Sequence, residues 1–221
     1  SGIWQTVWLE SVNFEYIKKV NFYTNIDESE VSIKIESDTI IEEIPKEIVI
    51  SFNNQEVIKT ITTLDYITLK IENPKLWSPE EPNLYQVTIK MSEDCVKSYF
   101  GMRKFSIEKI DGHQFLALNN RRYYFHGLLD QGYYPDGLYT PKSYDVYRYE
   151  LGVAKELGFN TLRKHIKVEP AIWYYLCDTL GIIVWQDFVN NGEYSFNNLP
   201  KGKYIIEFEY NNDTYYLVKA T

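Results

Sequence analysis

The spacing of the hydrophobic residues changes near residue 123, and this change limits the possible folds more than any other feature of the sequence. Before that point, apolar and polar residues alternate in short runs that are separated by turn residues. A period of two places one face of a strand on a core and the other face in water. So many short strands within residues 14–110 predict an antiparallel β-sandwich. The runs lie near 14–24, 31–36, 46–52, 56–63, 67–72, 85–91, 95–100 and 103–108.

After residue 123 the pattern predicts strands that alternate with helices. The nearly continuous apolar run Tyr123–Leu129 is typical of a strand that is covered on both faces. Further short strands are predicted at 159–163 and 182–185, and the second of these is also expected to be buried. Strand, helix, strand, helix and strand in this order predict parallel strands that are joined by right-handed crossovers.

Two amphipathic helices connect these strands. The first is expected to begin at Ser143, which can cap it, and to end at Gly158. The second opens with Glu169 and Pro170, because proline suits a first helical turn, and ends at Gly181. At helical spacing, the predicted buried faces are Val146, Tyr149, Val153, Ala154 and Leu157 in the first helix and Trp173, Leu176, Cys177 and Leu180 in the second.

The end of the chain, residues 192–221, reads as antiparallel β-structure with turn residues between the strands. We expect a hairpin over 203–218 that turns at Asn211, Asn212 and Asp213, since these residues tolerate the conformations of a tight turn. The predicted strands of this tail are 193–196, 203–210 and 214–218.

Composition excludes several classes of partner. The chain has 23 basic and 31 acidic residues and a net charge of −8, so neither nucleic acid nor an anionic membrane is an expected partner. No apolar run approaches the roughly 18 residues that a membrane-spanning helix needs. Cys95 and Cys177 are expected to be buried free thiols. His113 and His126 are too isolated to suggest a metal site, and no cofactor is expected.

Polar residues follow all three predicted parallel strands. Catalytic and binding residues are concentrated at the carboxyl ends of such strands. A ligand site that binds hydroxyl groups or a carboxylate is one interpretation, and structural ion pairs are the other. His165 alone is more typical of a hydrogen-bonded scaffold residue than of a base or ligand. The strand-end residues are Asp130 and Gln131, Arg163 and His165, and Gln186 and Asp187.

Several segments, taken in order, resemble glycoside hydrolase family 2, the β-galactosidase, β-glucuronidase and β-mannosidase family. Residues 2–10 resemble the last strand of its sugar-binding sandwich, and residues 76–85 resemble the hallmark of its immunoglobulin-like domain. Phe100–Lys104 resembles the junction into its barrel. The segments that resemble its first three barrel strands are 128–133, 162–165 and 184–187.

This resemblance implies a mixed architecture. Residues 1–13 would end a sugar-binding β-sandwich, and 14–110 would form the immunoglobulin-like antiparallel β-sandwich. Residues 111–191 would be an incomplete (β/α)8, or TIM, barrel with its first three strands, and 192–221 a short antiparallel β tail. A partial chain of a longer protein is therefore expected.

The resemblance also implies retaining hydrolysis of terminal β-glycosidic bonds with a β-glycoside as the partner molecule. That reaction needs two carboxylates about 5–5.5 Å apart. In the family these are the Glu of an Asn-Glu pair after the fourth barrel strand and a Glu after the seventh. No Asn-Glu pair occurs in this sequence, so the chain is expected to be inactive by itself. The residues that match substrate-pocket positions are Asp130, Arg163, His165 and Asp187, with Arg163 expected near the nucleophile.

The tail carries a second resemblance. Residues 192–204 are similar to part of the B-type repeat domains of Gram-positive surface proteins, which are small sandwiches used as stalks. A non-catalytic carbohydrate-binding or cell-surface module is therefore the alternative function. The oligomeric state and the compartment, cytoplasmic or cell-surface, stay open at this stage, as does the sugar.

Overall fold

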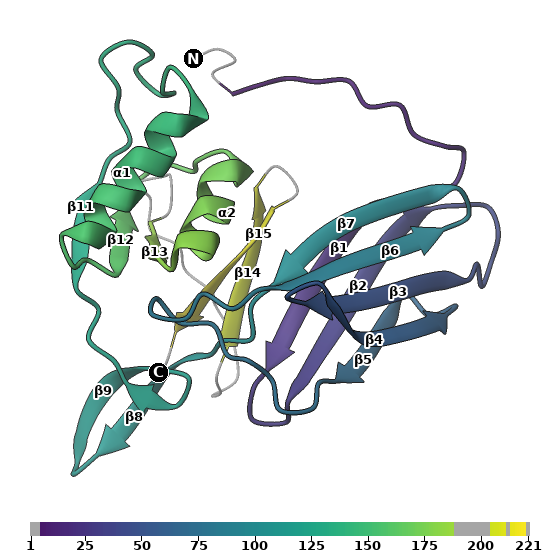
Figure 1. Cartoon of the computed structure of the whole chain (residues 1–221), viewed down its shortest axis with the longest axis horizontal. Helices are drawn as coiled ribbons and strands as arrows, with labels where there is room; N and C mark the ends of the chain where they lie inside the picture. The colour runs from purple at the N-terminus through teal and green to yellow at the C-terminus, as the bar shows by residue number, and fades with distance from the viewer. Residues whose placement is uncertain (1–4, 188–203, 211–212, 220–221) are drawn as a thin grey trace, which may run out of the picture. The chain divides into compact units, whose positions relative to one another are not determined.

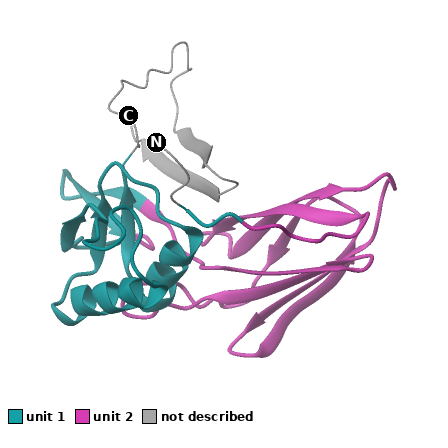
Figure 2. Cartoon of the chain, turned by 90° about the horizontal axis from the view of Figure 1, so that it is seen from above, with its two compact units in different colours: residues 1–7, 106–117, 121–221 teal, residues 8–105, 118–120 magenta. Residues whose placement is uncertain are grey.

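The computed structural model describes residues 5–187, 204–210 and 213–219. The chain divides into two compact units (Figure 2). One consists of residues 8–105 and 118–120, and the other of residues 1–7, 106–117 and 121–221. Each unit is described by itself below.

The unit of residues 8–105 and 118–120, magenta in Figure 2, contains two antiparallel sheets that share one hydrophobic core (Figure 1). The three-stranded sheet has the order β1-β2-β5, with β1 at Tyr16–Asn25, β2 at Glu30–Asp38 and β5 at Tyr66–Lys70. The four-stranded sheet has the order β4-β3-β6-β7, with β3 at Lys46–Phe52, β4 at Gln55–Thr62, β6 at Tyr85–Met91 and β7 at Asp94–Phe100.

Alternation along the strands builds this core. In β2 the inward residues Val31, Ile33 and Ile35 are at most 1% exposed, and they meet the inward side chains of β3 and β6 in a single cluster. Each large aliphatic side chain that is buried in this way stabilises the fold by about 1.5–3 kcal/mol. The predicted antiparallel β-sandwich is therefore confirmed.

One strand assigned to the sandwich lies elsewhere. The run expected near 103–108 is β8, Phe105–Ile110, which belongs to a separate three-stranded sheet of order β10-β9-β8. Asp111 and Gly112 both have positive φ, of 50° and 81°, which is the conformation of a tight hairpin turn. This Asp-Gly turn folds β8 onto β9, His113–Leu118, and β10 follows at Arg121–Arg122.

The other unit, teal in Figure 2, contains three parallel strands in the order β11-β12-β13 (Figure 1). They are Gly127–Asp130, Thr161–Lys164 and Ile183–Gln186. Helix α1, Tyr144–Glu156, and helix α2, Ala171–Leu180, form the crossovers. The predicted alternation of strands and helices is confirmed. Gly181 ends α2 in the left-handed conformation, as expected of a glycine at that position.

Two expectations for this unit are wrong. Only the end of the run Tyr123–Leu129 is in a strand, and Leu129 is 56% exposed, because it lies on the sheet face that α1 and α2 do not cover. The buried face of α1 consists of Tyr147, Leu151 and Ala154, whereas Tyr149 is 72% exposed. Tyrosine is amphipathic, so counting it as apolar rotated the predicted face toward solvent.

Two of the strands predicted for the tail are present and pair with each other. Strands β14, Tyr204–Tyr210, and β15, Asp213–Lys219, pair antiparallel, with Tyr210 opposite Asp213. The strand expected at 193–196 and the turn residues 211 and 212 lie outside the described residues. None of the described helices is long and apolar enough to cross a membrane.

Candidate functional site

The described helices α1 and α2 cover one face of the parallel sheet and leave the other uncovered. Leu162 and Val184 lie opposite each other and pack with side chains of α1 and α2. The next residues in register, Leu129, Arg163 and Trp185, are all exposed. Because neighbouring side chains on a strand point to opposite faces, these three residues define the uncovered face.

An arginine–aspartate pair lies at the carboxyl edge of the uncovered face. The Nε of Arg163 donates to Oδ1 of Asp187 at 3.1 Å, and its Nη2 lies 3.0 Å from Oδ2. This two-point contact fixes the plane of the guanidinium group and leaves further N–H donors for a ligand. The Arg163 side chain is 56% exposed and that of Asp187 is 16% exposed, so the pair is accessible to a small molecule.

Backbone hydrogen bonds extend the strand pairing past the last strand residues. The amide of His165 donates to the carbonyl of Asp130 at 2.9 Å, and the amide of Asp187 donates to the carbonyl of Lys164 at 3.0 Å. Continuing the alternation places the half-buried His165 on the same face as Arg163. Three of the four predicted site residues thus belong to one edge of one face.

Asp130 belongs to the opposite face. Its Oδ2 accepts a hydrogen bond from Nζ of Lys164 at 2.7 Å, and that lysine lies over the ring of Trp173 in α2. The structure therefore does not bring the carboxylate of Asp130 together with Arg163 and Asp187. Gln186 is also on the covered side, where it accepts from the hydroxyl of Tyr174.

A buried cluster of charged side chains underlies this edge, and the sequence analysis missed it. Oε1 of Glu169 lies 2.9 Å from Nζ of Lys164 and 2.8 Å from Nζ of Lys167, and Oε2 accepts from the Tyr147 hydroxyl at 3.0 Å. The side chains of Lys164, Lys167 and Glu169 are 0%, 3% and 0% exposed. Burial lowers the pKa of Lys167, and the hydrogen bond with Glu169 opposes this shift.

The backbone bends sharply between the members of the cluster. Ile166 has a φ of 50°, in the left-handed region that β-branched residues rarely adopt. Such strain persists only where the surrounding contacts impose it. The bend lets Lys167 and Glu169 fold back beneath Lys164. Lysine and glutamate are almost never fully buried, so the only sequence signal was their place between a buried strand and a buried helix.

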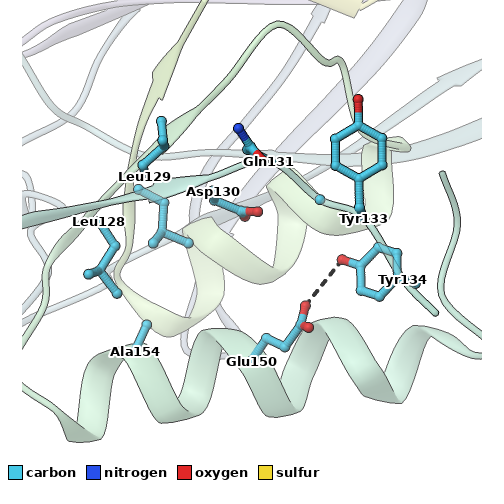
Figure 3. Close-up of a pocket in the computed structure, with 10 residues that line it drawn as sticks. Leu128, Leu129, Asp130, Gln131, Tyr133, Tyr134, Glu150 and Ala154 are labelled. Atoms are coloured by element: carbon cyan, nitrogen blue, oxygen red, sulfur yellow. Dashed lines mark hydrogen bonds between the residues drawn. The ribbon is translucent and has the colours of Figure 1, made fainter. Parts of the chain in front are cut away.

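A small pocket opens between β11 and α1 (Figure 3). Its lining includes Asp130, Tyr134 and Glu150, and the Tyr134 hydroxyl donates to Oε2 of Glu150 at 3.1 Å. Loss of water around the carboxylate raises the pKa of Glu150, and the hydrogen bond from Tyr134 opposes this shift. Burial is also the main cause that raises the pKa of Tyr134.

Replacing Glu150 by glutamine should increase the free energy of unfolding more at pH 7 than at pH 4. A carboxyl group whose pKa is raised on folding costs no stability below its unfolded value near 4.5, and the cost grows as the pH rises through the folded value. Urea unfolding of wild type and Glu150→Gln at both pH values measures this. The same substitution at Glu156, an exposed residue of α1, is the control. An equal pH effect in the two variants would contradict the prediction.

No group of three or more His, Cys, Asp or Glu side chains that could hold a metal ion occurs in the described part of the chain. Cys177 is buried, and burial raises the pKa of its thiol. Cys95 is exposed on β7, so the expectation that both thiols are buried is wrong. The two cysteines are not bonded to each other.

Comparison with known proteins relates part of the chain to one family. The model of glycosyl hydrolases family 2 matches residues 15–103. A provisionally named beta-glucuronidase of Formosa agariphila is 25% identical over 84% of this chain and 24% of its own length. A beta-galactosidase of Thermoanaerobacter pseudethanolicus is 26% identical over 90% of this chain and 29% of its own length. These matches support the resemblance of the chain to glycoside hydrolase family 2.

Solved structures of related proteins show the same fold. A beta-D-glucuronidase of Dictyoglomus thermophilum has a TM-score of 0.70 with 21% sequence identity, over 83% of this chain and 31% of that protein. A beta-glucuronidase of Faecalibacterium prausnitzii has a TM-score of 0.68 with 19% identity. The chain thus spans about a quarter to a third of these family 2 proteins.

Proposed function

We propose that the chain supplies part of the substrate-binding shell of a retaining β-glycoside hydrolase of family 2. The observation that carries this proposal is the two-point Arg163–Asp187 contact at the carboxyl edge of an otherwise uncovered sheet face. In the proposal, β11, β12 and β13 are the first three strands of a (β/α)8 barrel, whose interior is this face. The carboxyl edge of such a barrel is where catalysis takes place.

Each residue of the shell has a role that its surroundings suit. Asp187 offers a carboxylate to sugar hydroxyl groups, and Arg163 offers charged N–H donors to a hydroxyl or carboxylate of the substrate. His165 contributes a ring nitrogen from the same face. Asp130 acts as a positioning residue instead, because Lys164 holds its carboxylate and its carbonyl accepts the His165 amide. The ligand is a β-glycoside, as the names of the relatives suggest.

The proposal includes no hydrolysis by this chain alone. Retaining cleavage needs an acid/base and a nucleophile about 5–5.5 Å apart, and the Asn-Glu pair of the family is absent from the sequence. Chromogenic β-glucuronide, β-galactoside and β-mannoside should show no turnover above background at high protein concentration. Saturable turnover of any of the three substrates would contradict this expectation.

Binding tests the shell directly. We expect Arg163→Lys to weaken binding of methyl β-D-glucuronide or methyl β-D-galactoside about tenfold, because lysine cannot make the two-point contact that orients Asp187. Stability should change by less than about 1 kcal/mol, since the pair is partly exposed. Titration followed by NMR measures the affinity. Arg148→Lys, at an exposed arginine of α1, is the control and should bind like wild type. Wild-type protein that binds neither glycoside would overturn the proposed function.

A further inference from the structure

Two exposed tyrosines lie together on the loop between β11 and α1. Tyr133 is 60% exposed and Tyr139 is 43% exposed. Their ring centroids are 5.3 Å apart at an interplanar angle of 64°, and a hydrogen bond with Tyr139 raises the pKa of Tyr133. What distinguishes these two tyrosines is that their exposed rings contact each other close to the end of a strand, where they form one partly apolar surface.

The loop that carries these rings is held from inside the protein. The buried Nζ of Lys167 donates to the carbonyl of Gly132 at 2.5 Å and to the carbonyl of Tyr139 at 2.6 Å. Tyr134 and Leu138 exchange backbone hydrogen bonds of 2.8 and 2.9 Å, which close the loop between the two exposed rings. The rings are therefore placed by a fixed backbone, as a binding site requires.

Figure 3 shows the two sides of this loop. Tyr134 points toward Glu150 and α1, whereas Tyr133 and Gln131 point to the other side of the loop. Gly132 makes this division possible, because its φ of 64° turns the backbone between them. The exposed amide of Gln131 and the ring of Tyr133 thus follow β11, as Asp187 follows β13.

We propose that Tyr133 and Tyr139 form a stacking subsite for a pyranose ring, with Lys167 as the positioning residue. This inference rests on the proposed function and adds residues to its binding shell. A pyranose has an apolar C–H face and a rim of hydroxyl groups. A tyrosine ring offers a flat apolar surface and a hydroxyl that donates and accepts hydrogen bonds. The two chemistries match, and the amide of Gln131 adds a donor and an acceptor beside them.

Charge argues against the other flat ligand that stacks on aromatic rings. Nucleic acid bases also stack on tyrosine, but such sites combine aromatic rings with a positively charged groove. The chain has a net charge of −8, and the lysines near this loop are buried and paired with Glu169. A neutral or anionic sugar needs no such groove.

The test compares alanine substitutions at exposed tyrosines of the same unit in the 221-residue chain. Tyr133→Ala and Tyr139→Ala should each weaken binding of methyl β-D-glucuronide or methyl β-D-galactoside about 3- to 10-fold. Tyr133→Phe should retain most of the affinity, because it keeps the stacking surface. Tyr149→Ala is the matched control, since Tyr149 is 72% exposed on α1, and it should bind like wild type.

The outcomes separate this inference from the proposed function. If Arg163→Lys weakens binding and the alanine variants at 133 and 139 bind like wild type, the proposed function stands and the stacking subsite is refuted. Equal losses in Tyr133→Ala and Tyr149→Ala refute it as well. If the wild-type chain binds neither glycoside, both proposals fail. Amide NMR spectra of each variant report whether the fold is intact.

Discussion

Glu169→Gln is expected to destabilise the unit that contains the parallel sheet by about 3–5 kcal/mol, because it removes the buried charge that two buried lysines share. Lys164 and Lys167 would keep their ammonium groups with the carboxylate gone, and the amide that replaces it is a weaker acceptor. The side chain of Glu169 is 0% exposed, so water cannot take its place. Hydrogen exchange of the β12 and α2 amides measures this loss of stability.

The control for this substitution is Glu156→Gln at an exposed position of α1. It removes the same charge without leaving a buried lysine unpaired, so stability should change by at most about 0.5 kcal/mol. If both variants lose protection equally, net charge rather than the buried cluster determines the stability. A second variant, Glu169→Asp, keeps the charge on a shorter side chain and should fall between glutamine and wild type.

Gly132→Ala is expected to lower stability by about 2–5 kcal/mol, because a backbone penalty and a steric penalty coincide at this glycine. Its φ of 64° lies in the left-handed region, which costs other residues roughly 1–2 kcal/mol. A Cβ there would also lie 2.3 Å from Oε1 of Glu169 and 2.8 Å from Nζ of Lys167, and crowding of this kind costs typically 1–3 kcal/mol. The variant should therefore displace the charged cluster as well as the loop above it.

Gly158→Ala isolates the backbone part of that effect. Gly158 also has a positive φ, of 87°, but a Cβ there would meet nothing within 4 Å. Its cost should therefore be limited to the backbone term of roughly 1–2 kcal/mol. Thermal unfolding of both variants, together with exchange of the β11 and β12 amides, separates the two. Equal costs at the two positions would show that the contact with Glu169 contributes nothing.

Local sequence patterns were sufficient to predict the strands of the sandwich. Strand β6 shows why, since Tyr85, Val87, Ile89 and Met91 are all at most 2% exposed. Alternation depends only on the geometry of a single strand, so it can be read without knowing the partner strand. The end of α2 at Gly181 follows from equally local chemistry, because glycine adopts the left-handed conformation without strain.

The sheet that contains β8 needed more than the alternation pattern. The run near 103–108 has the right period for a strand, but period does not identify the partner. The Asp111-Gly112 turn pairs β8 with β9 and so removes β8 from the sandwich. That dipeptide is a readable hairpin signal, so this part of the fold was present in the sequence and was overlooked.

The sequence predicted which residues lie at the edge of the candidate site, but not which face of the sheet each side chain occupies. Strand ends identified Arg163, His165 and Asp187 as polar residues at one edge, because parallel strands bring their carboxyl ends together. The register of β11 against β12, Asp130 opposite Lys164, decides which face each side chain occupies. Register is set by the packing of α1 and α2 on one face, and it assigns Asp130 to the covered side.

The sequence by itself therefore determined the element types, the antiparallel β-sandwich and the polar edge that follows three parallel strands. Tertiary structure alone decided that Lys164, Lys167 and Glu169 are buried together. Charged side chains carry no period that marks them as buried, and their desolvation is tolerable only when opposite charges and hydrogen-bond partners converge from separate segments. That convergence depends on the bend at Ile166 and on the close approach of Gly132, which only the folded chain brings together.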